Sequence, residues 1–277
     1  MARHAPLLVA LMVLSAATPA RADDPFASAL RAADDAVVAI LAFHGPHDRP
    51  MAWPVTPYRD AAKIVVTSTL AFMKKTQHVR RDGRVAMLVG GWQVTGRARV
   101  HADISGDEFV ARFLPAEERK FPPLHEIRRV PFHRYLFWWY FGRVFIEFEP
   151  LVARPCIGDD HATLVTLDGD GFPVIVPIAA PAMNETSWPV VALDAGATLA
   201  DNASATVLQH VEPTMDDLHQ LVRRGRLRAG RFIERSRSGS LDPPPPRGWI
   251  GELKRQLEFH RQGREAKRII AGWDGRE

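Results

Sequence analysis

Residues 49–101 read RPMAWPVTPYRDAAKIVVTSTLAFMKKTQHVRRDGRVAMLVGGWQVTGRARVH, and this stretch decides the fold. Its apolar runs and turn residues predict a strand, a turn, a second strand, a short cationic helix and a long bent strand or hairpin. In residues 92–101 apolar and polar side chains alternate strictly, which indicates a strand with one buried face. Gly90 and Gly91 precede it and predict a bend or bulge of the kind that closes a small barrel.

The end of the second strand carries a pattern typical of an anion site. Hydroxyl side chains close the strand, and two lysines follow on the next helix: Thr67, Ser68, Thr69, Lys74 and Lys75. Free backbone amides at a helix start, together with ammonium groups, favour a bound phosphate. The same residues also fit a plain helix cap followed by a solvated basic face. Local sequence leaves both interpretations open.

The order of the segments RPMAWPVTP, KIVVTST, LAFMKKTQHVRRDGRV, AMLV and VTGRARV resembles the flavin-binding split barrel of the pyridoxamine 5'-phosphate oxidase-like family. The resemblance covers roughly residues 35–102. In that family a hydroxyl on strand three and a basic pair on the next short helix hold the FMN phosphate, while strand two lies along the isoalloxazine ring. The resemblance therefore implies a mainly β fold with short helices (α+β) that binds FMN.

The family's cofactor contacts transfer to particular positions of this chain. Thr69 matches the hydroxyl, with Thr67 and Ser68 beside it, and Lys74 and Lys75 match the basic pair. The ring-side backbone and a family glutamine that faces the ring correspond to the following positions: Pro54, Val55, Thr56 and Gln93. The chain departs from the family at Met73, where a serine is common, and in a shorter spacing from the glutamine to the next glycine.

The residues after 150 repeat the pattern of the first barrel. A predicted linker, 151–160, is followed by residues 161–235, in which SWPVVALD parallels AKIVVTST and LHQLVRRGRLRAG parallels WQVTGRARVHA. Between Asp194 and Ser204 the second copy has no hydroxyls that lead into a basic helix, so its anion pocket is expected to be lost. We therefore expect residues 23–150 and 151–235 to form a pseudo-dimer within one chain, with one flavin per chain.

The segments between and beyond the predicted barrel strands mostly predict helices. Residues 25–35 fit a helix capped by Asp24, and residues 103–131 fit helical pieces interrupted by prolines. An aromatic cluster, 135–141, fits a wall for a planar ligand, a core or an interface. Residues 236–277 predict a proline-rich linker and a basic amphipathic helix from 249 to 270, which fits packing against the barrel or contact with nucleic acid or acidic lipid.

The first 22 residues have a basic start, an apolar run and an Ala-Arg-Ala end, which is the layout of a cleavable signal peptide. The apolar run is too short to span a bilayer, so no transmembrane segment is expected. Export to the periplasm follows if the signal is used, and a cytoplasmic location follows if translation starts downstream.

Composition limits the other classes of function. The chain has 277 residues, 46% hydrophobic, and a formal charge of +4 that does not predict nucleic-acid binding. One cysteine, Cys156, excludes an intrachain disulfide and cysteine-based metal sites. His44 and His47 lie in a turn-rich loop without a third ligand, so no metal site is predicted.

The sequence thus predicts a flavin-dependent oxidoreductase that uses FMN or a deazaflavin on a small molecule, either as a monomer with a pseudo-dimeric core or as a homodimer. A second hypothesis is a non-catalytic flavin or haem carrier, for which the candidate axial ligands are His101, His133 and His210. The third is a cofactor-free interaction protein. No acid, base or nucleophile stands out in the sequence, which fits cofactor-borne chemistry and no chemistry equally.

Overall fold

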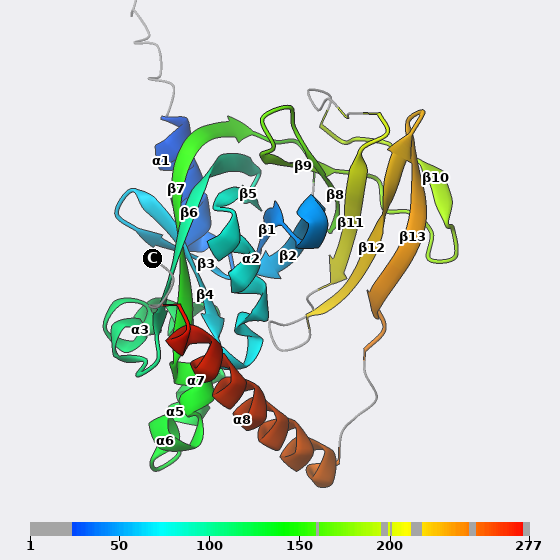
Figure 1. The fold of residues 1–277 in the computed structure, drawn as a ribbon. Helices are drawn as coiled ribbons and strands as arrows, with labels where there is room; N and C mark the ends of the chain where they lie inside the picture. The colour runs from blue at the N-terminus through cyan, green and yellow to red at the C-terminus, as the bar shows by residue number, and fades with distance from the viewer. Residues whose placement is uncertain are drawn as a thin grey trace, which may run out of the picture.

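The computed structural model describes residues 24–158, 161–194, 199, 201–211, 218–243 and 248–273. It consists of two antiparallel sheets with short helices around them and one long helix near the C-terminus (Figure 1). The predicted fold class, mainly β with short helices and a C-terminal helix, is confirmed. The predicted signal peptide lies outside the described residues.

The first sheet has seven strands in the order β2-β1-β5-β6-β7-β4-β3. Their bounds are β1 Ala39–His44, β2 Pro50–Val55, β3 Pro57–Asp60, β4 Lys63–Thr69, β5 Arg84–Val89, β6 Trp92–Asp103 and β7 Arg143–Pro155. Apolar residues from strands at both ends of this order, such as Val55 of β2 and Val66 of β4, belong to one buried cluster. The sheet therefore curls around a common core, as a half-open barrel does.

Two glycine positions set the curvature of this sheet. Gly90 and Gly91 both have positive φ and form a two-residue hairpin turn between β5 and β6, so of the bend or bulge expected there the structure has the bend. The bulge lies further along, where the register of β6 against β7 shifts at Gly96. A Cβ at Gly96 would lie 2.1 Å from the carbonyl oxygen of Glu149, so only glycine permits this close approach.

The second sheet has six strands in the order β10-β13-β12-β11-β8-β9. Their bounds are β8 Ala162–Leu167, β9 Pro173–Pro177, β10 Ser187–Pro189, β11 Ser204–Val211, β12 His219–Arg228 and β13 Arg231–Ser240. Read from β9, this order matches β2-β1-β5-β6-β7-β4 of the first sheet strand for strand. A bulge at Gly225, beside Phe232, corresponds to the bulge at Gly96 beside Phe148.

The two sheets pack face to face through a small apolar cluster. Ile40, Ala42 and Leu88 of the first sheet meet Val165 and Leu208 of the second. Thr206 also donates a hydrogen bond of 2.5 Å to the carbonyl of Pro50, at the start of β2. These contacts hold the second sheet against β1, β2 and β5, beside the site described below.

Helices cover the remaining faces of the first sheet. Helix α1 (Pro25–Asp35) begins as predicted, with the Asp24 carboxylate accepting from the amide of Phe26 at 3.0 Å. A 3-10 segment η1 (Pro46–Asp48) follows β1, and η2 (Leu70–Lys75) and α2 (Thr76–Arg81) follow β4. The 103–142 region forms five short helices: α3 Asp107–Arg112, α4 Leu114–Lys120, α5 Leu124–Arg129, α6 His133–Leu136 and α7 Trp138–Phe141. Their apolar residues pack on Val65 and Phe145, outside the barrel.

Helix α8 (Trp249–Ala271) confirms the predicted C-terminal helix and lies against η2 (Figure 1). Its anchoring contacts include Phe259, whose ring centre lies 4.5 Å from that of Trp139, and the buried Ala266 and Ile270, whereas Trp249 and Leu253 at its start are exposed. Within the described ranges, none of the helices combines the length and apolar character needed to cross a membrane.

Two expected boundaries differ from the structure. Residues 151–155 of the predicted linker continue β7, because beyond the Gly96 bulge they still pair with β6. Residues 236–240, expected in the flexible tail, belong to β13 and pair with β12 as far as Gln220. In both places the partner strand supplies backbone hydrogen bonds that a polar segment does not reveal in sequence.

Candidate functional site

A cavity of about 330 Å³ opens where the end of β4 meets β2 and the helical insertion. Pockets that hold small molecules are usually about 300–1,000 Å³, so this one is at the small end of that range. Its lining residues are Val38, Pro54, Val55, Thr56, Tyr58, Thr67, Ser68, Thr69, Phe72, Lys75, Glu117, Phe121, Tyr140, Arg143 and Leu218. Leu218 precedes β12, so the second sheet contributes to the wall.

The hydroxyl of Thr69 is the first feature that points to a ligand. Thr69 ends β4 and is buried, with 9% of its surface exposed, yet its Oγ1 has no hydrogen-bond partner among the described residues. Ser68 beside it makes only a long contact of 3.5 Å to the carbonyl of Thr69. A buried hydroxyl without a partner costs about 1–3 kcal/mol, which a ligand oxygen would offset.

Lys75 supplies a cation on the same side of the cavity. Its side chain is partly buried, and its ammonium lies 5.1 Å from the centre of the Trp53 ring. No carboxylate of the described residues forms an ion pair with it. Burial lowers the pKa of Lys75 to about 8. An unpaired, desolvated ammonium is the group that a bound anion stabilises most.

A buried polar network forms another part of the cavity wall. Glu117, on α4, accepts hydrogen bonds from the hydroxyls of Tyr58 and Tyr140, the latter at 2.8 Å, and pairs with Arg143 at 3.2 Å. The guanidinium of Arg143 lies 4.4 Å from the centre of the Tyr140 ring, and no described residue forms a hydrogen bond with its Nε. Burial raises the pKa of Tyr140 above its usual value, so this phenol stays protonated and donates.

The charges of this network nearly cancel. Arg143 is paired across the strands with Thr69, so both side chains lie on the same face of the sheet. Because Glu117 neutralises Arg143, the net charge of the cavity wall comes from Lys75. The arrangement therefore suits an anion at the Thr69–Lys75 end and a flat, partly apolar group between β2 and the aromatic side chains of Phe72, Phe121 and Tyr140.

Seven of the nine cofactor contacts suggested by the sequence line this cavity: Pro54, Val55, Thr56, Thr67, Ser68, Thr69 and Lys75. The structure places the other two elsewhere. Lys74 faces α8 with two thirds of its side chain exposed, and its ammonium is 3.3 Å from Glu265. Gln93 is buried but does not line the cavity, and its Oε1 accepts from Arg154 at 2.9 Å.

Lys74 and Gln93 lie outside the cavity for simple geometric reasons. Lys74 and Lys75 are consecutive in a 3-10 segment, so their side chains diverge by about a third of a turn. Gln93 is on β6, which lies two strands away from β4 in the sheet order with β7 between them.

Sequence analysis missed the acidic and cationic residues of the cavity wall, Glu117 and Arg143. Glu117 and Arg143 come from an insertion and from the start of β7, and no local pattern marks them. Tyr140 belongs to the aromatic cluster that was one candidate for a ligand wall. The rest of that cluster divides between core and surface, since Phe141 is buried and Tyr135 is 80% exposed.

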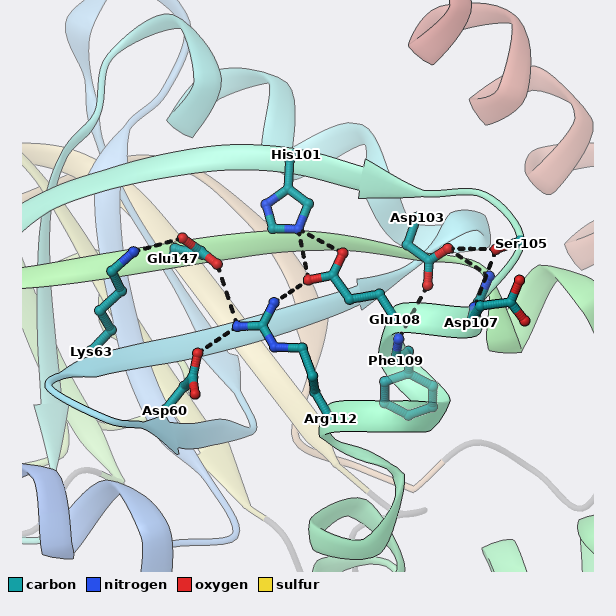
Figure 2. Close-up of polar contacts among 11 residues, drawn as sticks. Asp60, Lys63, His101, Asp103, Ser105, Asp107, Glu108, Phe109, Arg112 and Glu147 are labelled. Carbon is teal, nitrogen blue, oxygen red and sulfur yellow. Dashed lines mark hydrogen bonds and ion pairs between the residues drawn. The ribbon is translucent and has the colours of Figure 1, made fainter.

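A second group of charged residues lies on β3, β4, β6, β7 and α3 (Figure 2). His101, Glu108 and Glu147 offer ligand atoms within 4.8 Å of one another. However, Arg112 binds Glu108 and Asp60 and lies 3.5 Å from Glu147, and Lys63 pairs with Glu147 at 2.9 Å.

The hydrogen bond and charge of Lys63 hold the pKa of Glu147 below its usual value. The carboxylates of this group are therefore already neutralised by protein cations. The network fixes α3 onto the strands, aided by Asp103, whose carboxylate accepts from the amide of Phe109 at 3.1 Å.

The three histidines considered as haem ligands lie away from the cavity. His101 stacks on Phe145 and contacts Glu108 at 3.1 Å. His210 is buried near His161, with ring centres 5.6 Å apart, and His133 contacts the carbonyl of Val130. Of the described residues that line the cavity, none is a histidine.

The solved structures that are similar to this protein match about half of the chain. No family model and no curated protein matches it. Among solved structures, it is similar to a candidate pyridoxamine 5'-phosphate oxidase from Listeria innocua, at 19% identity and a TM-score of 0.34, covering 48% of this chain and 98% of that one.

Two further structures give the same picture. A conserved hypothetical protein from Mycobacterium tuberculosis has 21% identity and a TM-score of 0.37, with 50% of this chain and 88% of that one covered. An F420 reductase has 18% identity and a TM-score of 0.34, with 45% and 94% covered. The name of the Listeria innocua protein is that of the family which the sequence segments resemble.

Proposed function

We propose that this protein binds FMN in the β4 cavity and acts as an oxidoreductase on a small molecule. The observation that carries the proposal is that two groups without a polar partner among the described residues line one cavity, the Thr69 hydroxyl and the Lys75 ammonium. A phosphate ester supplies acceptor oxygens for the first and negative charge for the second. Such charge-assisted hydrogen bonds are about twice as strong as neutral ones.

The remaining residues of the cavity suit the rest of a flavin. The backbone of Pro54, Val55 and Thr56 on β2 forms one edge, and the exposed ring of Phe72 stands at another. Bound there, a flavin supplies hydride or electron transfer that no side chain of the protein supplies. The protein's own residues hold and orient the cofactor and exclude water from one side of it.

The Glu117, Tyr140 and Arg143 network faces the same space and is suited to positioning rather than proton transfer. Tyr140 is kept protonated and Glu117 is fully hydrogen-bonded, so neither is poised as a general base. Their role in the proposal is to hold Arg143 and α4 rigid beside the cofactor.

We propose one flavin per chain, bound by a pseudo-dimer of the two sheets. The shared strand order and the matching bulges at Gly96 and Gly225 support an internal repeat, and Leu218 brings the second sheet to the cavity wall. The proposal includes export after cleavage of residues 1–22, for which a mass of the mature protein starting at Asp23 is the expected result.

The test is a titration of the purified protein with FMN, followed by flavin absorbance and fluorescence, with a deazaflavin titration in parallel. Lys75→Ala is expected to weaken FMN binding at least about tenfold, since one charge-assisted contact is worth roughly 1.5–3 kcal/mol. Lys74→Ala is the matched control, because Lys74 faces α8, and it is expected to change affinity less than about threefold.

Wild-type protein that binds neither cofactor would overturn the proposal and favour a cofactor-free interaction protein. Equal loss of affinity in both lysine variants would show that the cavity is not the site. A stoichiometry of two flavins per chain would contradict the loss of the second site.

A further inference from the structure

A second, smaller cavity of about 90 Å³ lies where the start of β2 meets the second sheet. It lies outside the β4 cavity and shares no lining residue with it. Its walls come from both sheets, and seven of its ten lining residues have polar or charged side chains: Arg49, Pro50, Ser204, Ala205, Thr206, Arg224, Gly225, Arg226, Arg235 and Ser236. With roughly 30 Å³ for each water molecule in the liquid, the space matches a small oxyanion and not a nucleotide.

Arginines dominate the lining of this cavity. They are Arg49, Arg224, Arg226 and Arg235, and among the described residues no carboxylate forms an ion pair with any of them. Within the part of the chain that the structure describes, these guanidiniums form one hydrogen bond, from Arg224 to the hydroxyl of Ser238 at 3.0 Å. The other arginines that line the two cavities and the sheet junction are paired, for example Arg143 with Glu117 and Arg154 with Asp194.

The strand register explains why these side chains converge. Arg224 of β12 is the cross-strand partner of Thr206 on β11 and of Ser236 on β13. The three side chains therefore lie on one face of the sheet. The bulge after Arg224 inserts Arg235 opposite it as an extra residue on β13. Gly225 permits that bulge, since a Cβ there would lie 2.0 Å from the carbonyl oxygen of Ile233.

The first sheet closes the cavity from the other side. Thr206 binds the carbonyl of Pro50 at 2.5 Å, which fixes the start of β2, and therefore Arg49, over β11. Ser204 and Ser236 also line the cavity, and neither hydroxyl forms a hydrogen bond within the described part of the chain. The site thus presents cations and hydroxyl donors without an acceptor.

We propose that this cavity binds a phosphate group, either as inorganic phosphate or as part of a small phosphate monoester. Guanidinium groups match the planar edge of a phosphate with paired hydrogen bonds, and hydroxyls complete the shell of donors. Without an anion, like charges crowd together at the junction of the two sheets. The bound anion relieves that repulsion and links Arg49 of one sheet to three arginines of the other.

The test uses the full-length protein with Lys75→Ala as background, which removes the expected phosphate contact of the flavin cavity. Binding of inorganic phosphate and of glycerol 3-phosphate is measured by calorimetry, with sulfate as a competitor. The double variant Arg226→Gln, Arg235→Gln is expected to weaken binding at least about tenfold. Both side chains are exposed, so folding is retained and is checked by circular dichroism.

Arg228→Gln is the matched control, since Arg228 is exposed on the same strand but does not line the cavity. It is expected to change affinity less than about twofold. Preference for inorganic phosphate or for the monoester identifies the source of the group, and either supports the site. Absence of binding of both ligands, or an equal loss in Arg228→Gln, overturns the proposal.

Discussion

At the end of β4 the first sheet presents the unbonded hydroxyl of Thr69 beside the ammonium of Lys75, whereas the second sheet presents the carboxylate of Asp194 after β10. In the sequence parallel between AKIVVTST and SWPVVALD, Thr69 and Asp194 occupy the same last position. Asp194 is already paired with Arg154, a residue of β7 in the first sheet, at 2.9 Å.

The difference shows how one strand order can support a binding site at one end and a structural contact at the other. The end of β4 in the first sheet has no carboxylate beside Lys75, whereas the corresponding end in the second sheet has the carboxylate of Asp194. Arg154 also binds Gln93, and the thiol of Cys156 lies 3.7 Å from Asp194, so this end is filled by protein groups. Burial and the charge of Asp194 raise the pKa of Cys156 to about 11, which keeps the thiol unreactive.

The largest loss of unfolding free energy is expected from substitution of Glu117, which lines the β4 cavity of the first sheet. Glu117→Ala leaves the charge of Arg143 buried without its partner, and such losses cost about 3–5 kcal/mol. Urea unfolding at neutral pH measures the change. Glu126→Ala is the control, because Glu126 is 71% exposed and its bond to Arg129 is expected to contribute less than about 0.5 kcal/mol. Similar small losses in both variants would contradict the role given to the network.

The two bulge glycines test whether the sheets are equivalent in structure. Gly96→Ala and Gly225→Ala each place a Cβ about 2 Å from a backbone oxygen, and overpacking of this kind costs roughly 1–3 kcal/mol. We expect similar losses of unfolding free energy for the two variants. Gly169→Ala, with nothing within 4 Å of the new Cβ, is the neutral control. A loss at one glycine alone would break the parallel.

Asp194→Asn tests the contact that fills the second end. Removing the charge weakens the bond from Arg154, which is about a third exposed, so a loss of about 1–2 kcal/mol is expected. Asp34→Asn, whose contact to the exposed Arg119 is 3.8 Å long, is expected to be nearly neutral. FMN stoichiometry should stay at one per chain in Asp194→Asn; a gain of a second flavin would show that the carboxylate alone had blocked the site.

The smallest and most specific effect is the pH dependence of FMN binding. Because burial lowers the pKa of Lys75 to about 8, its positive charge is present below that pH and is lost as the pH rises through it. Phosphate is a dianion above about pH 6, so affinity should be greatest between about pH 6 and 8 and fall above that. Fluorescence titrations from pH 6 to 10 measure the decline.

Lys75→Arg provides the control for this pH profile, since a guanidinium stays charged throughout that range. Its FMN affinity should not decline above pH 8, and the weak binding of Lys75→Ala should be flat over the same range. A decline that persists in Lys75→Arg would assign the titration to another group.

The sequence by itself determined the strands, the sheet class and one wall of the site. Alternation in residues 92–101, the hydroxyl run at 67–69 and the capped start at Asp24 are local signals, because side-chain period and helix capping depend on near neighbours in the chain. For the same reason the C-terminal helix and the short helices of the insertion were predictable.

Only the tertiary structure decided which of these residues share a cavity. Lys74 and Lys75 are indistinguishable in sequence, yet packing of α8 against η2 pairs one with Glu265 and leaves the other unpaired. Glu117 and Arg143 meet because α4 folds back onto the start of β7, a contact between distant segments that no local pattern encodes. The physical reason is that periodicity fixes which face a side chain occupies, whereas the partner across that face is set by long-range packing.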